Sequence, residues 1–548
     1  MTGKVAAPRV LISEKLSPAG IEILEKAGVT VDVRLGLDAA ALEAIIGDYD
    51  GLIVRSATKV NRSLIEKATR MRVVGRAGTG VDNIDLQAST ENGIVVCNTP
   101  DANTMAAAEF AVALAMAICR NIPQADRRFH EDDFRKNLLV GIELEGKTAG
   151  VIGLGRIGAI VARKLAGLGM DVVAYDQYVN QERFDRLGIR RASSLDELLQ
   201  QVDLLTLHTP KTKETLNLIG ARELALMKPG ARLVNASRGG IVDEDALYDA
   251  LASGHIAAAA LDVLAVEPNT AAAPGTQNFR HRLMELDNVL LTPHLGASTR
   301  EASEAVSTQI AEQIARVLNG ELVPAVNLPP IAGSLDEMAP WIGLAEKLGS
   351  IWFQTENKPV DLIRIRYSGR VLSDEHGLVT LSVLTGFLRP ISEHRINFVN
   401  VRQNIRDMGI DVIEEVEEVQ AGGVPDGRFP DLLTVCFERE GRALEVSGTV
   451  IGGGREVLVD FFGYPVDYTF TPVMLALHND DVPGVIGRVG SLIGERGINI
   501  DDMRWARKSL RSHAEALISI DQMPDEDLLE DLRALSGVNH VSLLDFRG

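Results

Sequence analysis

The distribution of apolar and polar positions predicts an α/β unit at the start of the chain. Short apolar runs with the length of β-strands alternate with amphipathic segments such as I-E-I-L-E-K-A and L-E-A-I-I, which is typical of parallel sheets joined by helices. The predicted strands, all between Arg9 and Pro100, are R-V-L-I-S, T-V-D-V-R, G-L-I-V-R-S, M-R-V-V-G-R and I-V-V-C-N.

A second and larger alternating series extends from Gly146 to about Thr292. Its predicted strands are T-A-G-V-I-G-L, M-D-V-V-A-Y-D, V-D-L-L-T-L-H, A-R-L-V-N-A and I-A-A-A-A-L-D. Each is followed by a helical segment, so the pattern predicts a doubly wound domain. The amphipathic stretch from Thr299 to Leu318 stops at Asn319-Gly320, a helix-ending signal, and we expect this helix to pack back on the first unit.

The pattern changes after residue 320. Three prolines in E-L-V-P-A-V-N-L-P-P, from Glu321 to Pro330, predict a linker into a new domain. A mixed unit with a glycine-rich hairpin signal, S-G-T-V-I-G-G-G-R-E-V-L-V-D, follows it. From Thr471 onward the order reads β-α-β-β-α-β, which is ferredoxin-like.

The predicted fold class is therefore α/β, with two flavodoxin/Rossmann-like doubly wound domains followed by a mixed α+β domain and a ferredoxin-like domain. The predicted boundaries are 1–98 with 294–326 for a discontinuous first domain, 99–293 for the second, 327–470 for the third and 471–548 for the last. A length of 548 residues suits three or four domains of about 100–200 residues.

Composition excludes several classes of partner. The net charge of −20 argues against nucleic acid and anionic membranes as partners. The cysteines Cys97, Cys119 and Cys436 show neither disulfide nor zinc spacing, so we expect no metal and a reducing cytoplasm. No signal peptide is expected. The run from Ala106 to Cys119 is too short for a membrane span and contains Glu109, so we expect a helix buried at a domain or subunit interface.

A glycine motif predicts the cofactor. G-L-G-R-I-G lies where a strand ends and a helix begins, and its glycines are Gly153, Gly155 and Gly158. The next strand ends at Asp176, a carboxylate suited to the ribose hydroxyls of a dinucleotide. Gln177 and Tyr178 follow instead of arginines, which favours NAD over NADP. The alternative is a glycine-rich turn without a ligand.

Three polar residues at or after apolar runs predict hydride chemistry on a 2-hydroxy or 2-oxo acid. Arg238 offers a planar fork of donors for a carboxylate or carbonyl. His294 suits a proton shuttle, and Glu267 would stabilise its protonated ring. Ligands of open α/β sheets bind beyond the carboxyl ends of strands, where these side chains would converge. Singly, each also fits a helix-capping arginine, a surface glutamate or a core histidine.

These motifs carry a family resemblance. S-R-G-G, D-V-L-A-V-E-P and T-P-H-L-G, behind G-L-G-R-I-G, resemble the D-isomer-specific 2-hydroxyacid dehydrogenase family over about the first 320 residues. V-R-S-A-T-K-V, G-R-A-G-T-G-V-D-N and N-T-P-D-A-N-T are most similar to the branch that acts on 3-phosphoglycerate, whose long form ends in a regulatory ACT domain. The resemblance implies NAD-dependent oxidation of 3-phospho-D-glycerate to 3-phosphohydroxypyruvate, the first step of phosphorylated L-serine biosynthesis.

The resemblance also implies binding residues. The implied substrate residues are Arg55, Ser56, Arg76, Gly78 and Asn103, with either Arg135 or Lys136 as a further phosphate cation. Beyond the glycines and Asp176, the implied cofactor residues are Arg156, Ile157, Thr209 and Asp262. A dianionic phosphate and a carboxylate need such a cationic cluster in an acidic chain. Arg55 pairing with a neighbouring aspartate is the structural alternative.

The last domain implies regulation and assembly. By resemblance, serine is the expected effector at a dimeric interface, with Asp481 and Asn499 at the matching positions. Asn479 and Val482 stand in this loop without the arginine that often precedes the proline, and Asp481 and Asn499 also fit plain loop and helix caps. The resemblance further implies a homotetramer built on a dimer through the Ala106 helix.

Two other functions fit parts of the pattern. A hydroxypyruvate or glyoxylate reductase would share Arg238, Glu267 and His294 but would need no phosphate cluster. An NADH-sensing corepressor would use the same fold to recruit partners, but it would have no need of a regulatory amino-acid domain.

Overall fold

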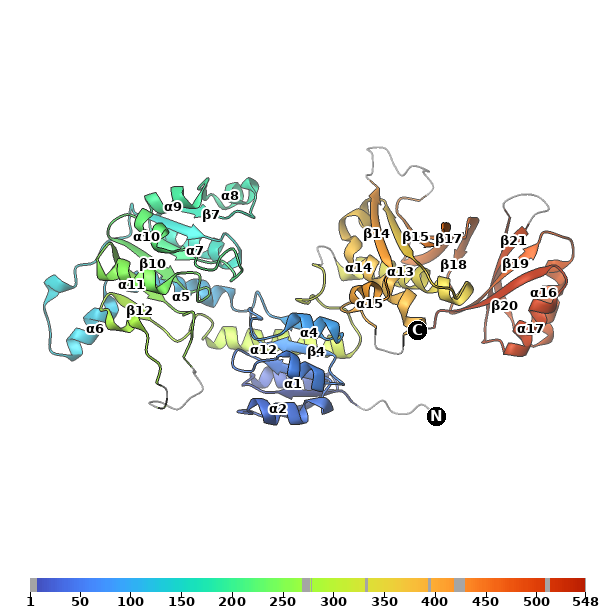
Figure 1. Ribbon diagram of the computed structural model, residues 1–548, viewed down its shortest axis with the longest axis horizontal. Coiled ribbons are helices and arrows are strands. Elements are labelled where there is room, and N and C mark those ends of the chain that lie inside the picture. Colours follow the sequence, from blue (N-terminus) through green and yellow to red (C-terminus); the bar gives the residue numbers. More distant parts are fainter. Residues whose placement is uncertain are drawn as a thin grey trace.

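The computed structural model describes residues 7–268, 276, 278–330, 334–392, 396–417, 429–507 and 513–547. Figure 1 shows a long molecule with the sheet of residues 148–291 at the left end, the sheet of residues 9–98 near the middle and the two C-terminal units on the right. Four separate sheets, one per unit, confirm the predicted fold class.

The first sheet is parallel, in the order β2-β1-β3-β4-β5, which is flavodoxin-like. Its strands are β1 (Arg9–Ile12), β2 (Thr30–Val33), β3 (Gly51–Val54), β4 (Val73–Arg76) and β5 (Val95–Asn98). Its helices are α1 (Pro18–Lys26), α2 (Ala39–Ile45), α3 (Arg62–Lys67) and α4 (Leu86–Glu91), with a 3-10 turn η1 (Ile46–Asp48). All five strands lie where the apolar runs predicted them.

Helix α12 (Arg300–Leu318) returns to this unit, as predicted. Val306, Ile310 and Ile314 belong to the same buried cluster as Val73 of β4. The approach is so close that a Cβ on Gly75 would lie 2.8 Å from Ile310 Cγ1, so only glycine fits there.

The second sheet has the order β12-β11-β10-β9-β6-β7-β8, a Rossmann-type doubly wound arrangement with its switch point between β6 and β9. Its strands are β6 (Thr148–Ile152), β7 (Asp171–Tyr175), β8 (Arg190–Arg191), β9 (Leu204–Leu207), β10 (Ala231–Asn235), β11 (Ile256–Leu261) and β12 (Val289–Leu291). Its helical segments are α5 (Thr104–Cys119), α6 (Ile122–His130), η2 (Lys136–Leu138), α7 (Arg156–Gly167), α8 (Gln181–Leu187), α9 (Leu195–Gln201), α10 (Ala221–Leu226), α11 (Glu244–Ala252) and η3 (Arg282–Glu285).

Helix α5 uses its apolar side within this unit. It packs on α7 and on strands β10 and β11, and Ala108, Ala111 and Ile118 are buried there. Within the described residues, no single helix is long and apolar enough to cross a membrane; only α5 and α6 taken together reach that length, and they are bent by 62°.

The third unit is a six-stranded mixed sheet with two long helices. Its strands are β13 (Leu362–Ser368), β14 (Asp411–Glu417), β15 (Leu432–Arg439), β16 (Arg442–Ile451), β17 (Arg455–Phe461) and β18 (Tyr464–Thr469). Its helical segments are α13 (Leu335–Thr355), α14 (Arg370–Leu388), η4 (Arg389–Ile391) and α15 (Val401–Asp407). The predicted glycine-rich hairpin is β16–β17. The predicted linker is partly docked, because Val326 N donates to Val96 O at 2.7 Å beside β5.

The last unit confirms the ferredoxin-like order. Its elements are β19 (Val473–Asp480), α16 (Val485–Glu495), β20 (Ile500–Arg507), β21 (His513–Ile520), α17 (Glu526–Ala534) and β22 (Val538–Asp545), in the sheet order β20-β21-β19-β22. One sheet face packs on α16 and α17. On the other face, Met474 and Leu544 belong to the core cluster of the third unit, which joins the two units.

Candidate active site

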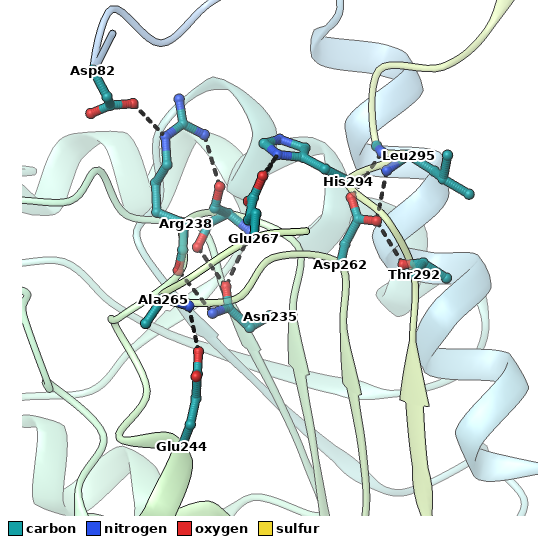
Figure 2. Close-up of polar contacts among 12 residues, drawn as sticks. Asp82, Asn235, Arg238, Glu244, Asp262, Ala265, Glu267, Thr292, His294 and Leu295 are labelled. Atoms are coloured by element: carbon teal, nitrogen blue, oxygen red, sulfur yellow. Dashed lines mark hydrogen bonds and ion pairs between the residues drawn. The ribbon is translucent and has the colours of Figure 1, made fainter. Parts of the chain in front are cut away.

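The turn after β10 carries Arg238 to the edge between the first two units. Asn235, the buried last residue of β10, accepts from Ser237 N at 3.1 Å and donates through Nδ2 to Arg238 O at 2.9 Å, which fixes the turn. The Arg238 guanidinium reaches the first unit, where its Nε lies 3.4 Å from Asp82 Oδ2 (Figure 2). A Cβ on Gly80 would lie 2.3 Å from an Arg238 nitrogen, so a larger residue there would displace the guanidinium.

His294 and Glu267 form the pair that the sequence predicted. His294 Nδ1 lies 3.1 and 3.2 Å from the two Glu267 carboxylate oxygens, and both side chains are 42% exposed. Figure 2 shows this pair beside Arg238, above the carboxyl ends of the neighbouring strands. Because Glu267 occupies Nδ1, the other ring nitrogen, Nε2, is left to face a ligand.

Asp262 holds the turn that presents His294. Its carboxylate is 2% exposed and accepts three hydrogen bonds, from Thr292 Oγ1 at 2.6 Å, Leu295 N at 2.7 Å and Gly296 N at 2.8 Å. His294 itself adopts a left-handed backbone with φ of 56°, which is rare for a side chain of its size. The contacts therefore make Asp262 a support of this turn, and its predicted contact with the cofactor stays a prediction.

Three arginines gather on the first unit's side of the site. Burial first, and then the charges of Arg238 and Arg55, lower the pKa of Arg76 to about 10. Arg76 Nε is buried and has no hydrogen-bond partner among the described residues. A Cβ on Gly78, whose φ is 144°, would lie 1.5 Å from Arg76 Nη1, so glycine makes room for the guanidinium. Such a concentration of positive charge fits an anionic ligand.

Of the other predicted substrate residues, Asn103 and Ser56 lie near the three arginines, whereas Arg135 is bound elsewhere. Asn103 lies close to this region, since its Oδ1 accepts from Thr79 Oγ1 at 2.7 Å, and Ser56 is exposed next to Arg55. Arg55 makes no ion pair with an aspartate in the described part of the chain. Arg135 instead forms a two-pronged ion pair with Asp133, with both contacts at 2.7 Å.

The structure does not bring Arg135 or Lys136 to the arginine cluster. Both follow α6, which projects from the second unit in Figure 1. The guanidinium of Arg135 holds the pKa of Asp133 well below its usual range. Within one chain, the choice between the two cations therefore stays open.

The glycine loop after β6 has the shape of a dinucleotide site. A Cβ on Gly158 would lie 1.9 Å from Gly153 O, and one on Gly153, with φ of 89°, would lie 2.5 Å from His208 O. A Cβ on Gly155 would meet only open space. Gly155 caps α7 without a side-chain bond, so the first amides of that helix face outward, as a pyrophosphate requires.

Further polar groups surround this loop. Asp176 ends β7 and accepts from Leu154 N at 2.8 Å and Tyr178 N at 2.9 Å. Thr209 Oγ1 is buried without a hydrogen-bond partner among the described residues, so it is available to a ligand. Burial lowers the pKa of His208 to about 4 and keeps it neutral. These groups fit an NAD molecule with its pyrophosphate at Gly155 and its adenosine ribose at Asp176.

The remaining predicted cofactor residues are at the start of α7. Arg156 Nε forms an exposed ion pair with Asp101 Oδ1 at 2.6 Å, and the Ile157 side chain packs against the cluster that buries α5. Arg156 therefore has a protein partner that a phosphate would have to replace. Ile157 can contact a cofactor only through its backbone or the exposed part of its side chain.

Sequence reasoning missed three residues that hold the site. Asn235 carries a weak signal, because a polar residue ends an otherwise apolar strand. Asp82 and Glu244 carry none, since their importance comes from contacts with Arg238 and Ala265, which are far away in the sequence.

Comparison with known proteins agrees with these observations. Residues 112–296 match the NAD binding domain of D-isomer specific 2-hydroxyacid dehydrogenases, residues 337–462 the D-3-phosphoglycerate dehydrogenase intervening domain, and residues 473–537 the ACT domain. The D-3-phosphoglycerate dehydrogenase of Methanocaldococcus jannaschii is 38% identical over 98% of this chain and 99% of its own length. That of Bacillus subtilis is 35% identical, with the same coverage. The chain belongs to the D-3-phosphoglycerate dehydrogenase family.

Solved structures of related dehydrogenases and reductases are similar to a little over half of this chain. D-lactate dehydrogenase of Aquifex aeolicus, crystallised with NAD and lactic acid, has 28% identity and a TM-score of 0.52, covering 57% of this chain and 96% of that one. A glyoxylate reductase of Paecilomyes thermophila has 28% identity and a TM-score of 0.53, covering 59% and 99%. The cofactor of this dehydrogenase family member is NAD.

The two predicted effector residues of the ACT domain lie at opposite ends of β20, so one chain does not bring them together. Asp481 Oδ2 lies 3.4 Å from Arg507 Nη1 on β20. Asn499 precedes β20, where its backbone N donates to Asp521 Oδ1 at 3.1 Å and its Nδ2 to Asp501 at 3.2 Å. Both residues also make the local contacts expected of loop caps, so their effector role stays a prediction.

Proposed function

We propose that this protein oxidises 3-phospho-D-glycerate to 3-phosphohydroxypyruvate with NAD, the first step of phosphorylated L-serine biosynthesis. The observation that carries the proposal is the arginine cluster of Arg55, Arg76 and Arg238 beside the His294–Glu267 pair. A phosphate and a carboxylate on one small substrate call for several cations next to one proton acceptor. The name of the full-length relatives supports the same substrate.

The residues of this chain have distinct roles in the proposed reaction. NAD, when bound at the glycine loop, supplies the hydride acceptor. The guanidinium of Arg238 binds the substrate carboxylate and orients the carbon that is oxidised, while Arg55 and Arg76 bind the phosphate. His294 Nε2 accepts the proton of the hydroxyl group. Glu267 stabilises the resulting imidazolium through Nδ1, so the charge is neutralised where it forms.

The proposal is tested by following NADH formation from NAD and 3-phosphoglycerate. We expect activity in the wild type and a loss of about 100-fold to 10,000-fold in kcat for His294→Ala. The same assay in reverse compares phosphorylated with unphosphorylated hydroxypyruvate. A higher kcat/KM for the unphosphorylated acid would instead identify a hydroxypyruvate or glyoxylate reductase, and binding of NADH without turnover of either acid would favour a corepressor.

We propose serine as the effector of the ACT domain, at Asp481 and Asn499. Because Asp481 lies at one end of β20 and Asn499 precedes the other, the proposed site is at a dimer interface, where Asp481 of one chain and Asn499 of the other suit the ammonium and the carboxylate of one serine. The test is a titration of initial rates with serine. We expect inhibition in the wild type and a concentration for half-inhibition at least ten times higher in Asp481→Ala. Unchanged inhibition in that variant would place the effector elsewhere.

We propose a homotetramer built on a dimer through α5 and α6. Beyond α5, large apolar side chains stand exposed, including Phe129 at 66% and Val140 at 77%. The rings of Phe129 and Phe134 contact each other at 5.2 Å, and such a patch is typical of a subunit interface. Light scattering of the wild type and of Phe129→Ser tests this, with smaller particles expected in the variant.

We propose a reducing cytoplasm as the location of the protein, which its three free, buried cysteines support.

A further inference from the structure

The proposed catalytic carboxylate, Glu267, sits on a long excursion of the chain. Strand β11 ends at Leu261, and the next regular element among the described residues, η3, begins at Arg282. Glu267 lies near the start of this excursion and is 42% exposed, so its own packing does not fix it. Something else must hold the loop if Glu267 is to stay within hydrogen-bond distance of His294.

One carboxylate contacts both ends of the excursion. Glu244, the first residue of α11, accepts from Ala265 N through Oε1 at 2.6 Å, two residues before Glu267 (Figure 2). Its other oxygen, Oε2, lies 2.9 Å from Nε2 of His281, the last residue before η3. The Glu244 and His281 side chains are only 15% and 18% exposed, so water competes little for these bonds.

The direction of the second bond follows from the other ring nitrogen. Leu283 N donates to His281 Nδ1 at 3.3 Å, which makes Nδ1 an acceptor. The ring proton of neutral His281 must then be on Nε2, where it is donated to Glu244. The imidazole is thus saturated at both nitrogens and aligned, and the Phe279 ring stacked on it at 6.4 Å supports the same orientation.

The start of the excursion is also held from the opposite side. A Cβ on Gly239 would lie 1.9 Å from Leu264 O, so the backbone next to Arg238 is in direct contact with the backbone before Ala265. Leu264 and Ala265 therefore lie between the turn of Arg238 and helix α11. This contact links the proposed substrate cation to the proposed proton-relay carboxylate.

We propose that Glu244 is a positioning residue that closes the excursion and thereby holds Glu267 against His294. The inference rests on the proposed function for its kinetic consequence, but its structural part does not. Glu244 touches neither substrate nor cofactor and acts through the Ala265 backbone. Asp245, the next residue of α11, provides a matched control, because it is 82% exposed and its one ion pair within the described residues is with Arg282, at the far end of the excursion.

The kinetic test compares Glu244→Gln, Glu267→Gln and the double variant. We expect Glu244→Gln to lower kcat about ten-fold with little change in KM, because the arginine cluster is untouched. Since Glu267 stabilises protonated His294, the acid-side inflection of the kcat/KM profile should move to lower pH in both single variants. The double variant should lose no more than Glu267→Gln alone. Multiplied losses, or an unmoved pH profile in Glu244→Gln, would overturn the proposal.

Hydrogen exchange separates this proposal from the proposed function. In Glu244→Ala, the Ala265 amide should exchange about ten-fold faster, whereas Asp245→Asn should leave it unchanged. Should Glu244→Ala fail to fold, His281→Gln is the second variant, because it breaks only the contact between Glu244 and residue 281. In that variant the amides of residues 278–285 should exchange faster. Equal amide exchange in all variants would refute the positioning role of Glu244. If the wild type is inactive but the variants still differ in exchange as expected, the proposed function is refuted and the positioning role of Glu244 is not.

Discussion

Replacing Arg76 by methionine should stabilise the free protein and weaken substrate binding at the same time. Burial and the neighbouring charges of Arg238 and Arg55 lower the pKa of Arg76 from 12.5 to about 10. A shift of that size corresponds to about 3 kcal/mol against the charged form in the folded chain. Methionine keeps much of the length of the apolar stem and removes the charge.

The sign follows from linkage. Because the pKa of Arg76 is lower in the folded than in the unfolded chain, the folded protein carries this cost at every pH below about 10, and the cost fades as the pH rises above that value. At neutral pH we therefore expect Arg76→Met to be more stable by roughly 1–3 kcal/mol, after allowance for screening inside proteins. The dianionic phosphate of the substrate offsets the same cost in the wild type, so the KM for 3-phosphoglycerate should rise at least ten-fold in the variant.

The assay is denaturant unfolding without ligands, followed by the same measurement in millimolar 3-phosphoglycerate. The wild type should gain more stability from the ligand than Arg76→Met does. Arg163→Met, which removes an exposed arginine from α7, is the matched control and should change neither quantity. A destabilised Arg76→Met with an unchanged KM would refute both the charge argument and the assignment of this cluster to the phosphate.

Further substitutions probe the supports of the site. In Gly158→Ala the new Cβ would lie 1.9 Å from Gly153 O, so NAD affinity, measured by fluorescence titration, should fall more than ten-fold. Asp262→Asn turns an amide NH2 toward a donor such as Leu295 N, so kcat should fall about ten-fold to 100-fold while the Kd of NAD stays constant. A raised Kd would instead indicate that Asp262 contacts the cofactor. Asp176→Ser should raise the NADP/NAD ratio of kcat/KM at least ten-fold, and an unchanged ratio would contradict its ribose role.

Much of the fold could be predicted because buried parallel strands leave a clear apolar signature. Strands β1 to β5, β6, β7 and β9 to β11 all follow such runs. The two-residue β8, with its exposed arginines, leaves no pattern to detect. Helices α13 and α14 were not predicted, for a physical reason. They contain Pro340 and glycines that count against helices in isolation. Their mutual packing explains two of the glycines, since a Cβ on Gly349 would lie 2.0 Å from Val383 O and one on Gly386 2.0 Å from Glu346 O.

The candidate site shows the same division. Arg238, Glu267 and His294 could be selected from sequence because each lies at or just beyond the carboxyl end of a strand, where the topology of open sheets directs ligands. Glu244 and the contacts of Asp262 could not, because these carboxylates accept from backbone amides of other segments, and sequence spacing carries no information about which amide a carboxylate will accept from. Asn235 leaves only a weak signal, and its contacts lie within its own turn. Prediction from motifs therefore finds the groups that meet a ligand more readily than the groups that hold them in place.

Arg238 links the two units before any substrate arrives. Its contact with Asp82 is a 3.4 Å ion pair to a side chain that is 68% exposed, which is worth at most about 1 kcal/mol. A substrate carboxylate can bind the same guanidinium through two parallel hydrogen bonds, which is the stronger arrangement. Under the proposed function, Asp82 thus holds the guanidinium toward the arginine cluster in the free protein and yields to the substrate at little cost. In both states Arg238 connects the first unit to its own turn, and the neighbouring Gly239 in that turn contacts Leu264 at the start of the Glu267 excursion.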